Sequence, residues 1–486
     1  MSPFITILIL IAYFGLLMLV AKLTANRRTD NATFYLANRQ MPWYLVAFGM
    51  IGASISGVSL VSVPGMVGAS QFSYLQTTLG FCFGYLVVAF VLIPLYYRLN
   101  LTSIYGYLGC RFGLSAHRTG AVFFIIAKMI TSATKLYVAV IVLQQFVFDA
   151  WGVPLWATVT VCVLLIWLYT RNGGIRTIVW TDVVQTFFLL VAMMLILLKI
   201  MQLMDLNIPS AGKLLNHHAL SRVFVFDDWH STRHFLKQFF SGIFIVIVMT
   251  GLNQDMMQKN LSCRNEHESR RNMLWYGAAF IPVNLVLLVI GALLLIYAGN
   301  ENILLPQNPD AIVPFFAAHH LGQLVCVCFV IGIIAASFSS ADSALTAVTT
   351  SVMVDFLKKE KGVALAEDRR LRRRVHLGVC VLFVGITLLF ECVRNQSLID
   401  VIYTLVGYAY GPLLGLFAFG LLTKRQVRNR AIPCIAIAAP VITYIMQTFC
   451  ALTLNYHFGY ELLIINGLIT FIGLAVAVAP KMTVSQ

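Results

Sequence analysis

The sequence predicts an all-α polytopic membrane protein with 13 transmembrane helices. Hydrophobic residues make up 59% and charged residues 11% of its 486 residues, and the mean hydropathy is +0.84. Soluble domains contain about 45–50% apolar residues. Apolar runs of about 20 residues, long enough to cross a hydrocarbon core of ~30 Å, recur along the whole chain. These observations exclude soluble enzymes, disordered chains and disulfide scaffolds.

Each transmembrane span is expected where apolar residues run with little interruption. The thirteen ranges are 3–22, 44–66, 75–97, 120–147, 153–170, 177–201, 238–257, 273–297, 324–353, 376–394, 399–422, 431–453 and 459–479. The first has no basic residue before it but is followed by Lys22, Arg27 and Arg28. That polarity is opposite to a cleavable signal peptide, so the first range is expected to remain as a span.

The positive charges predict the orientation. The chain carries 34 Lys and Arg against 19 Asp and Glu, and the great majority of the basic residues fall in alternate connections, including the run from Lys358 to Arg374. Because cytoplasmic loops hold the excess of Lys and Arg, the N-terminus is expected outside and the C-terminus inside the cell membrane. The net charge of +15 thus indicates topology and contact with anionic membrane lipid, not nucleic acid. No obligatory protein partner is evident.

The long connection at residues 202–237, which the charge pattern places on the outer side, contains a group of histidines. His230 and His234 are four residues apart and could bind a metal ion if this stretch is helical. Without Cys or Glu partners, loop histidines are more often simply exposed.

The second span has an unusual composition for a membrane helix. Between Gly52 and Gly65 it contains glycines, several serines and a proline, which weaken a helix. Freed carbonyl groups are tolerated in a bilayer where they line a cavity, so this span is interpreted as a discontinuous helix at a binding site. The alternative is a seam where small residues allow close helix packing.

The ninth span carries a polar stripe. Ser339, Asp342 and Ser343 are spaced i, i+3 and i+4 and therefore share one helix face. A carboxylate and two hydroxyls would be costly against lipid, so this face is expected to point into the protein. Ligands that are all oxygen suit a hard cation, not a transition metal.

Two further charges lie inside spans. Asp182 is near the inner start of the sixth span and is either part of the same cation site or a helix-start residue in contact with water. Lys135 lies in the middle of the fourth span and needs an anion, which is either an embedded Asp or an anionic substrate. Lys128, nearer the end of that span, can extend toward water instead.

These features resemble the sodium:solute symporter family, which includes sodium-coupled carriers of sugars, proline, pantothenate and sialic acid. The likeness covers about residues 1–480. The segments that carry it are Gly52 to Gly65, Thr102 to Leu108 before Arg111-Phe112-Gly113, Gly173 to Arg176 leading to Trp180-Thr181-Asp182, Asn253-Gln254-Asp255 with Gln258, Ser339-Ser340, and Gly411 to Leu416 through Thr423-Lys424-Arg425.

The resemblance implies a core of two inverted five-helix repeats whose first and sixth helices are unwound at the substrate. The expected division is an extra span and inner loop (1–43), a first repeat (44–201), an outer loop (202–237), a second repeat (238–425), and two further spans with a short inner tail (426–486). Span counting agrees, because five spans in 44–201 make the next unit enter from the opposite face.

The resemblance also implies the sodium ligands. One sodium ion would be held between the second and ninth spans, by the residues Gly52, Ile55, Ala336, Ser339 and Ser340. A second, present in some relatives, would use Asp182, Ser339 and Ser343. Asp342 stands where the relatives have Ser, so either a second sodium or a proton could relieve the two neighbouring acids.

Substrate contacts implied by the resemblance come from the second, third, fourth and seventh spans. They are Ser54, Ser56, Ser59, Gln76, Lys135 and Asn253. Carriers of acidic sugars use an arginine that corresponds here to Thr131, one turn from Lys135.

The expected function is that of a symporter which imports a small polar solute with sodium by alternating access. The solute is either an organic or sugar-acid anion, such as sialic acid, or a neutral sugar or amino acid. A membrane enzyme would place histidines or paired acids at a membrane face, and a channel would use a repeated ring of pore-lining groups. Neither pattern is present, so no catalytic residue is expected.

Overall fold

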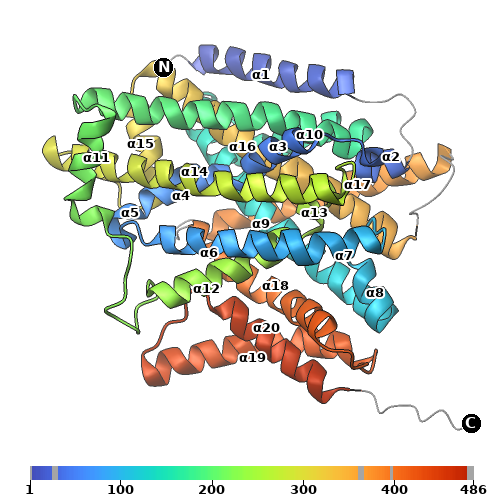
Figure 1. Cartoon of the computed structure of the whole chain (residues 1–486). Coiled ribbons are helices and arrows are strands. Elements are labelled where there is room, and N and C mark those ends of the chain that lie inside the picture. Colours follow the sequence, from blue (N-terminus) through green and yellow to red (C-terminus); the bar gives the residue numbers. More distant parts are fainter. Residues whose placement is uncertain (1–2, 25–30, 359–365, 394–397, 479–486) are drawn as a thin grey trace, which may run out of the picture.

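The computed structural model describes residues 3–24, 31–358, 366–393 and 398–478, which form helices joined by short connections. Most of the long helices run alongside one another, from one end of the molecule to the other (Figure 1). Helix α1 (Pro3–Thr24) packs on α10 at one edge, and α18 (Leu398–Leu422), α19 (Ala431–Leu454) and α20 (Leu462–Val476) pack together at the opposite edge. These edges contain the predicted extra spans.

The first half of the chain contains helices up to the long outer connection. They are α2 (Asn31–Leu36), α3 (Trp43–Ser54), α4 (Gly57–Gly65), α5 (Val67–Ser70), α6 (Tyr74–Val87), η2 (Val88–Leu92), α7 (Ile93–Arg98), α8 (Gly106–Phe112), α9 (Leu114–Leu143), η3 (Gln144–Phe148) and α10 (Leu155–Leu203). The outer connection contains α11 (Ile208–Asn216).

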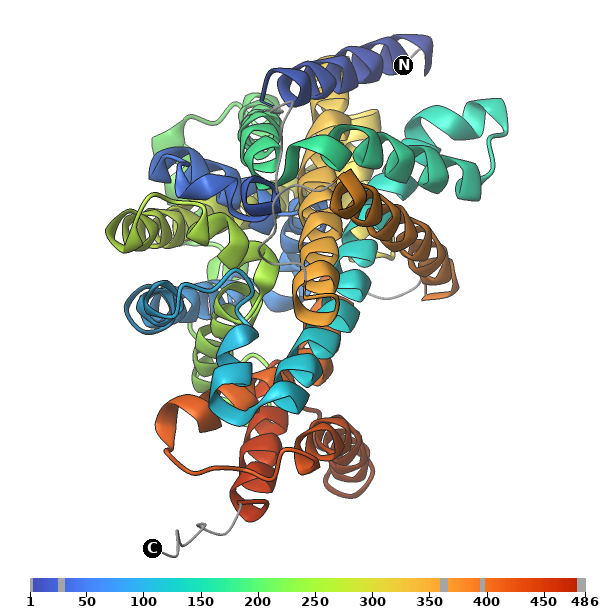
Figure 2. The same ribbon diagram turned by 90° about the vertical axis from the view of Figure 1, so that its right-hand side faces the viewer.

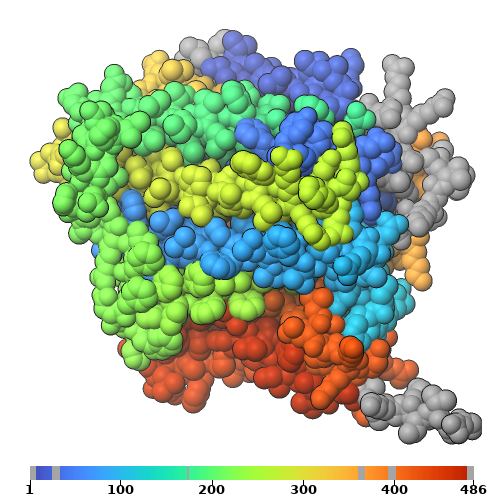
Figure 3. Space-filling view, in the orientation of Figure 1, coloured from blue at the N-terminus to red at the C-terminus, as the bar shows by residue number. Residues whose placement is uncertain are grey.

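The second half continues with a similar set of helices. They are α12 (Phe235–Val246), η6 (Ile247–Gly251), α13 (Gln254–Leu261), α14 (Glu266–Asn300), η7 (Pro309–Ala311), α15 (Ile312–His319), α16 (Gln323–Ser351), η8 (Val352–Phe356) and α17 (Ala366–Leu389) before α18. On the face shown in Figure 3, α14, α6 and α12 lie side by side in close-packed layers.

Two membrane helices are interrupted at corresponding places. The α3–α4 pair bends by 54° and the pair formed by 235–251 and α13 bends by 64°. At the first break, Ser56 has an extended backbone (φ −78°, ψ 171°), and at the second, Asn253 leaves the helix and accepts a hydrogen bond from Asp255 N–H at 3.1 Å. The predicted discontinuity of the second span is thus present in the fold, and each break falls in the first span of a predicted repeat.

Helix α10 joins two predicted spans. It runs for 49 residues and turns at Gly174, whose φ of 58° lies in the left-handed region. A Cβ atom at this position would come within 2.5 Å of the Phe34 carbonyl oxygen, so only glycine fits both the backbone and the space.

The number of membrane crossings stays a prediction. Within the described residues, eight helices are long and apolar enough to cross a membrane, or up to ten if each bent pair is one span. The segments Leu155–Arg171 and Leu462–Val476 are shorter apolar helices. Every one of the thirteen predicted ranges nevertheless contains a helix, so an all-α, multi-pass architecture is confirmed.

The basic run from Lys358 to Arg374, which the charge pattern predicts to be a solvated loop on the inner side, is only partly a loop. Residues 359–365 lie outside the described part, but α17 already begins at Ala366 and includes the arginines that follow. Arg372 is buried, and its guanidinium lies over the ring of Phe34 at 4.1 Å. The prediction of a solvated loop was therefore wrong for residues 366–374, because a count of charges contains no information on a helix that packs one of its arginines inward.

Helix α16 forms the centre of the molecule. It packs against α10, α9, α3 and α4, and it lies in the middle of the view in Figure 2. From Phe329 to Ser351 every side chain is buried. The polar stripe of the ninth span therefore faces protein and not lipid, as its composition predicted.

Candidate ion and solute site

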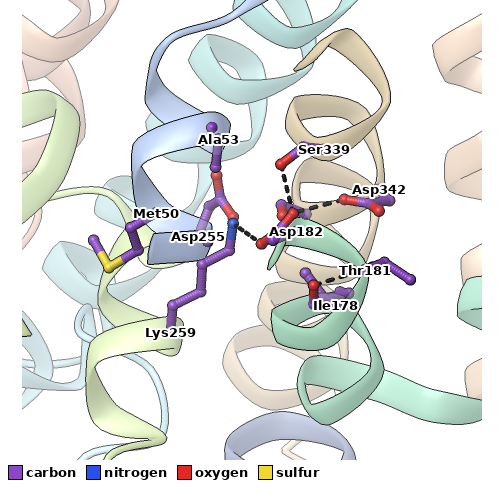
Figure 4. Close-up of polar contacts among 12 residues, drawn as sticks. Met50, Ala53, Ile178, Thr181, Asp182, Asp255, Lys259, Ser339 and Asp342 are labelled. Carbon is purple, nitrogen blue, oxygen red and sulfur yellow. Dashed lines mark hydrogen bonds and ion pairs between the residues drawn. The ribbon is translucent and has the colours of Figure 1, made fainter. Parts of the chain in front are cut away.

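The two predicted embedded acids both lie against α16. Asp182 on α10 accepts a hydrogen bond from the Ser339 hydroxyl at 2.5 Å (Figure 4). Asp342 on α16 accepts hydrogen bonds from the Tyr169 hydroxyl at 2.8 Å and from Ser343 at 3.2 Å. Both acids are completely buried, which contradicts the alternative that Asp182 is a water-exposed helix start.

A third charged side chain enters this cluster. The Lys259 ammonium is 2.8 Å from the second carboxylate oxygen of Asp182, and both side chains are 1% exposed. Because Lys259 follows the predicted span 238–257, the charge pattern counts it among the basic residues of an inner connection, and this prediction was wrong. The helix resumes after the break as α13 and carries Lys259 into the interior.

A second buried ion pair also lies outside the sequence expectation. The Lys128 ammonium on α9 is 2.5 Å from an Asp255 carboxylate oxygen on α13, and both residues are buried. The expectation that Lys128 reaches toward water was wrong because an acid lies directly beside it. Asp255 and Lys259 are four residues apart on α13 and therefore share one helix face, but this spacing does not indicate their partners on α9 and α10.

The break in α3 meets the α16 hydroxyls. Ser340 donates a hydrogen bond to the carbonyl oxygen of Ala53 at 3.1 Å, and the Gly52 N–H donates to the Thr186 hydroxyl of α10 at 3.1 Å. A Cβ atom at Gly52 would be 2.1 Å from that hydroxyl oxygen, so glycine is required for this close approach of α3 and α10. The last turn of α3 is thereby held against both α10 and α16.

The remaining predicted sodium ligands occupy the same region. Ile55 is buried at the break itself, and Ala336 is buried on α16 one turn before Ser340. Carbonyl groups at the end of α3, hydroxyls of α16 and two carboxylates are therefore gathered where α3, α10 and α16 pack together. Such oxygen groups suit a hard cation.

A small cavity lies between the two interrupted helices. Its volume is about 70 Å³, and its lining includes Ser54, Lys135 and Asn253 of the predicted substrate set, together with Thr131 and Tyr276. The Ser54 and Tyr276 hydroxyls are hydrogen bonded at 2.5 Å. Ligand pockets usually enclose about 300–1,000 Å³, so this cavity is smaller than a typical ligand pocket.

Lys135 is the charged group of this cavity that has no opposite charge in the protein. It is partly exposed to the cavity, and within the described part of the chain it forms no ion pair. Lys128, two turns earlier on the same face of α9, is already paired with Asp255.

Three predicted substrate residues lie elsewhere. The amide of Gln76 is engaged by the outer connection, because its nitrogen donates to the Arg233 carbonyl at 3.0 Å and its oxygen accepts from Val225 N–H at 3.2 Å. Ser56 is buried at the α3–α4 break, and Ser59 lies on α4. None of these three lines the central cavity.

Polar contacts between helices lie on two sides of the cavity. On the predicted outer side, a hydrogen bond of 2.9 Å joins the hydroxyls of Tyr74 and Tyr403. Tyr403 separates the cavity from a larger hollow of about 520 Å³ that it also lines. On the predicted inner side, Gln258 of α13 donates to the Tyr35 carbonyl at 2.7 Å and to Thr350 at 3.1 Å.

The outer histidines do not form a metal centre in the described residues, which contain no group of three or more His, Cys, Asp or Glu side chains suited to a metal ion. The His234 ring instead accepts a hydrogen bond from Leu236 N–H at 3.3 Å. His230 packs against the ring of Tyr456.

Two interrupted helices beside a cavity lined in part by polar and charged side chains, with buried acids and hydroxyls beside one of the breaks, define an ion-coupled secondary transporter. The sequence model of the sodium:solute symporter family matches residues 34–437, and the chain belongs to this family. It is a sodium-coupled membrane symporter that moves a small polar solute by alternating access.

Individual relatives span most of the chain. The sodium/sialic acid symporter NanT of Aliivibrio fischeri is 26% identical over 95% of this chain and 92% of its own length. The sodium-dependent multivitamin transporter of Oryctolagus cuniculus is 27% identical over 79% of this chain and 61% of its own length. A solved structure of a Na+-coupled sialic acid symporter has the same fold, with a TM-score of 0.82 at 20% identity over 97% of each chain.

Proposed function

We propose that the solute is a small organic anion with a carboxylate, of the kind represented by sialic acid, and that Lys135 binds this carboxylate. Sequence identity does not select the solute, because relatives at 26% and 27% identity are named for sialic acid and for vitamins. The observation that carries the proposal is the position of Lys135 in the cavity without an anionic partner in the described protein.

The charges around the cavity support this assignment. Asp255 is matched by Lys128 and Asp182 by Lys259, so neither acid is left to neutralise Lys135. A buried charge inside a membrane protein requires a partner. A carboxylate solute between Lys135, Thr131 and Asn253 supplies that partner, and Ser54 and Tyr276 offer hydrogen bonds to its neutral hydroxyl or amide groups.

The sodium ions bind, in this proposal, where α3 meets α10 and α16. The ligands are oxygens of Gly52, Ile55, Ala336, Ser339, Ser340, Asp182, Asp342 and Ser343, and they accommodate one or two ions. The hydrogen bonds of Ser340 to Ala53 and of Ser339 to Asp182 support this site, because they show the hydroxyls turned toward the neighbouring oxygens.

We also propose the topology given by the charge distribution, with thirteen crossings, the N-terminus outside and the C-terminus cytoplasmic. Residues 44–201 and 238–425 then form the two inverted repeats. The two helix breaks support this division, because each falls in the first span of its repeat. Import would require the Tyr74–Tyr403 contact and the contacts of α13 to open in alternation.

Solute binding can be tested with the purified protein. We expect carboxylates such as sialic acid to raise its thermal stability in sodium chloride but not in choline chloride, since a ligand that binds the folded state at 100 times its Kd stabilises by about 2.7 kcal/mol. Neutral sugars and the amide analogues of the carboxylates serve as control solutes. Stabilisation by neutral solutes alone would contradict the anion proposal, and equal shifts in choline would contradict sodium coupling.

Removal of both predicted hydroxyl ligands should weaken sodium binding. We expect the double variant Ser339→Ala and Ser340→Ala to raise the sodium concentration for half-maximal uptake about 30-fold, since two lost ligand interactions of ~1 kcal/mol each amount to ~2 kcal/mol. Ser337→Ala removes a hydroxyl from the same helix that bonds neither Asp182 nor Ala53 and is the control. Unchanged sodium activation in the double variant would remove these residues from the site.

A further inference from the structure

Asp182 already has a cation beside it. Its two carboxylate oxygens are engaged separately, one by the Ser339 hydroxyl at 2.5 Å and the other by the Lys259 ammonium at 2.8 Å. Figure 4 shows Lys259 extending from α13 to Asp182, with Ser339 on the far side of the carboxylate. Both charged side chains are buried, so water does not screen this pair.

We propose that Lys259 is a built-in cation of the Asp182 site and that it takes the place of one sodium ion. The inference rests on the proposed sodium site and deepens it, because it assigns the number of ions that the site takes. It also takes Asp182 out of the ligand set proposed above: with Lys259 in place, Asp182 shapes the site through Ser339 but holds no sodium ion of its own. The sodium ion is bound by the remaining oxygens.

The charge of the cluster carries this inference. With both acids ionised, Asp182 and Asp342 contribute two negative charges and Lys259 one positive charge, while Tyr169, Ser339 and Ser343 are neutral donors. One sodium ion brings the cluster to neutrality. A second would leave an uncompensated positive charge in a buried site, where charges interact far more strongly than in water.

The partners of the two Asp182 carboxylate oxygens also support this inference. An ammonium group has three hydrogen-bond donors and no acceptor, so the Asp182 oxygen that faces Lys259 directs its lone pairs at the ammonium. The other oxygen accepts the short hydrogen bond from Ser339. Neither oxygen is directed at an open space, because Asp182 is completely buried.

The acid of α13 itself has another cation beside it. Asp255 lies one turn before Lys259 on the same helix but has Lys128 at 2.5 Å. Lys259 is therefore available to Asp182, and because it lies on the interrupted helix its ion pair also joins α13 to α10.

The number of bound ions tests the proposal directly. We would measure 22Na+ bound per molecule of the full-length purified protein by equilibrium dialysis, for the wild type and for Lys259→Gln, Lys259→Arg and the double variant Asp182→Asn with Lys259→Gln. Lys259→Gln should bind one more sodium ion than the wild type, because the cluster charge becomes more negative by one. Lys259→Arg should bind the wild-type number.

The double variant keeps the test decisive if Lys259→Gln does not fold. It removes one charge of each sign, so the proposal expects the wild-type number of sodium ions. Loss of one ion in the double variant, or an unchanged number in folded Lys259→Gln, would mean that Asp182 itself holds a sodium and would overturn the proposal. Absence of sodium on the wild type would instead overturn the proposed sodium site.

Discussion

Replacing Lys135 with Met should reduce uptake of a carboxylate solute by about 10- to 100-fold and leave uptake of its amide analogue nearly unchanged. A charge-assisted hydrogen bond in a buried site is worth ~1.5–3 kcal/mol, which corresponds to this range. Met keeps the length and apolar stem of the side chain, so the cavity between the interrupted helices retains its shape. The selectivity follows because Lys135 forms no ion pair within the described part of the chain.

The measurement is uptake of the two analogues into proteoliposomes by both proteins under a sodium gradient. Lys199→Met is a matched control, because Lys199 lies far along α10 and its ammonium bonds Gln202 at the surface. Equal losses for the carboxylate and the amide in Lys135→Met would show that Lys135 has a structural role. A neutral sugar or amino acid would then be the better solute assignment.

The local features of this site could be predicted from the sequence. A helix break is encoded by its own residues, and the Gly52 to Gly65 segment contains the glycines, serines and proline that weaken a membrane helix. The α16 stripe follows from helical spacing alone, which places Ser339, Asp342 and Ser343 on one face. Lys135 could be identified as a candidate functional residue, because charged residues in the middle of a membrane span are rare and usually have a functional role.

The pairing of charges could not be predicted in this way. Lys128 and Asp255 are 127 positions apart, and no periodicity connects them. Lys259 was assigned to an inner connection because charge counting treats a basic residue at the end of a span as exposed. The break at Asn253 changes that assignment, since α13 continues into the interior at an angle of 64° to the helix before it.

The direction in which a side chain points could not be predicted from the sequence either. Gln76 lies on a helix that borders the cavity, and its polarity made it a reasonable substrate ligand. Its amide instead bonds Arg233 and Val225 of the long outer connection, which has no regular pattern that would predict its path.

Lys128 and Lys135 are seven residues apart on one face of α9, yet replacing each by Met should have different effects on the stability of the protein. Lys128→Met leaves Asp255 buried without its partner, because Lys259 is already bound to Asp182. Breaking one side of a buried ion pair costs about 3–5 kcal/mol. Lys135→Met removes a buried charge that lacks a protein partner, so it should leave stability unchanged or raise it.

The midpoint of thermal unfolding of the solubilised protein, measured without solute, separates these outcomes. We expect Lys128→Met to lower it strongly, and the double variant Lys128→Met with Asp255→Asn to recover most of the loss, since no uncompensated charge then remains at that position. Lys135→Met is the matched control. If Lys128→Met melts with the wild type, the Lys128–Asp255 pair does not hold α13 to α9, and Asp255 would be free to neutralise another cation of the cavity. Lys135 would be the nearest candidate, and the anionic-solute proposal would lose its main support.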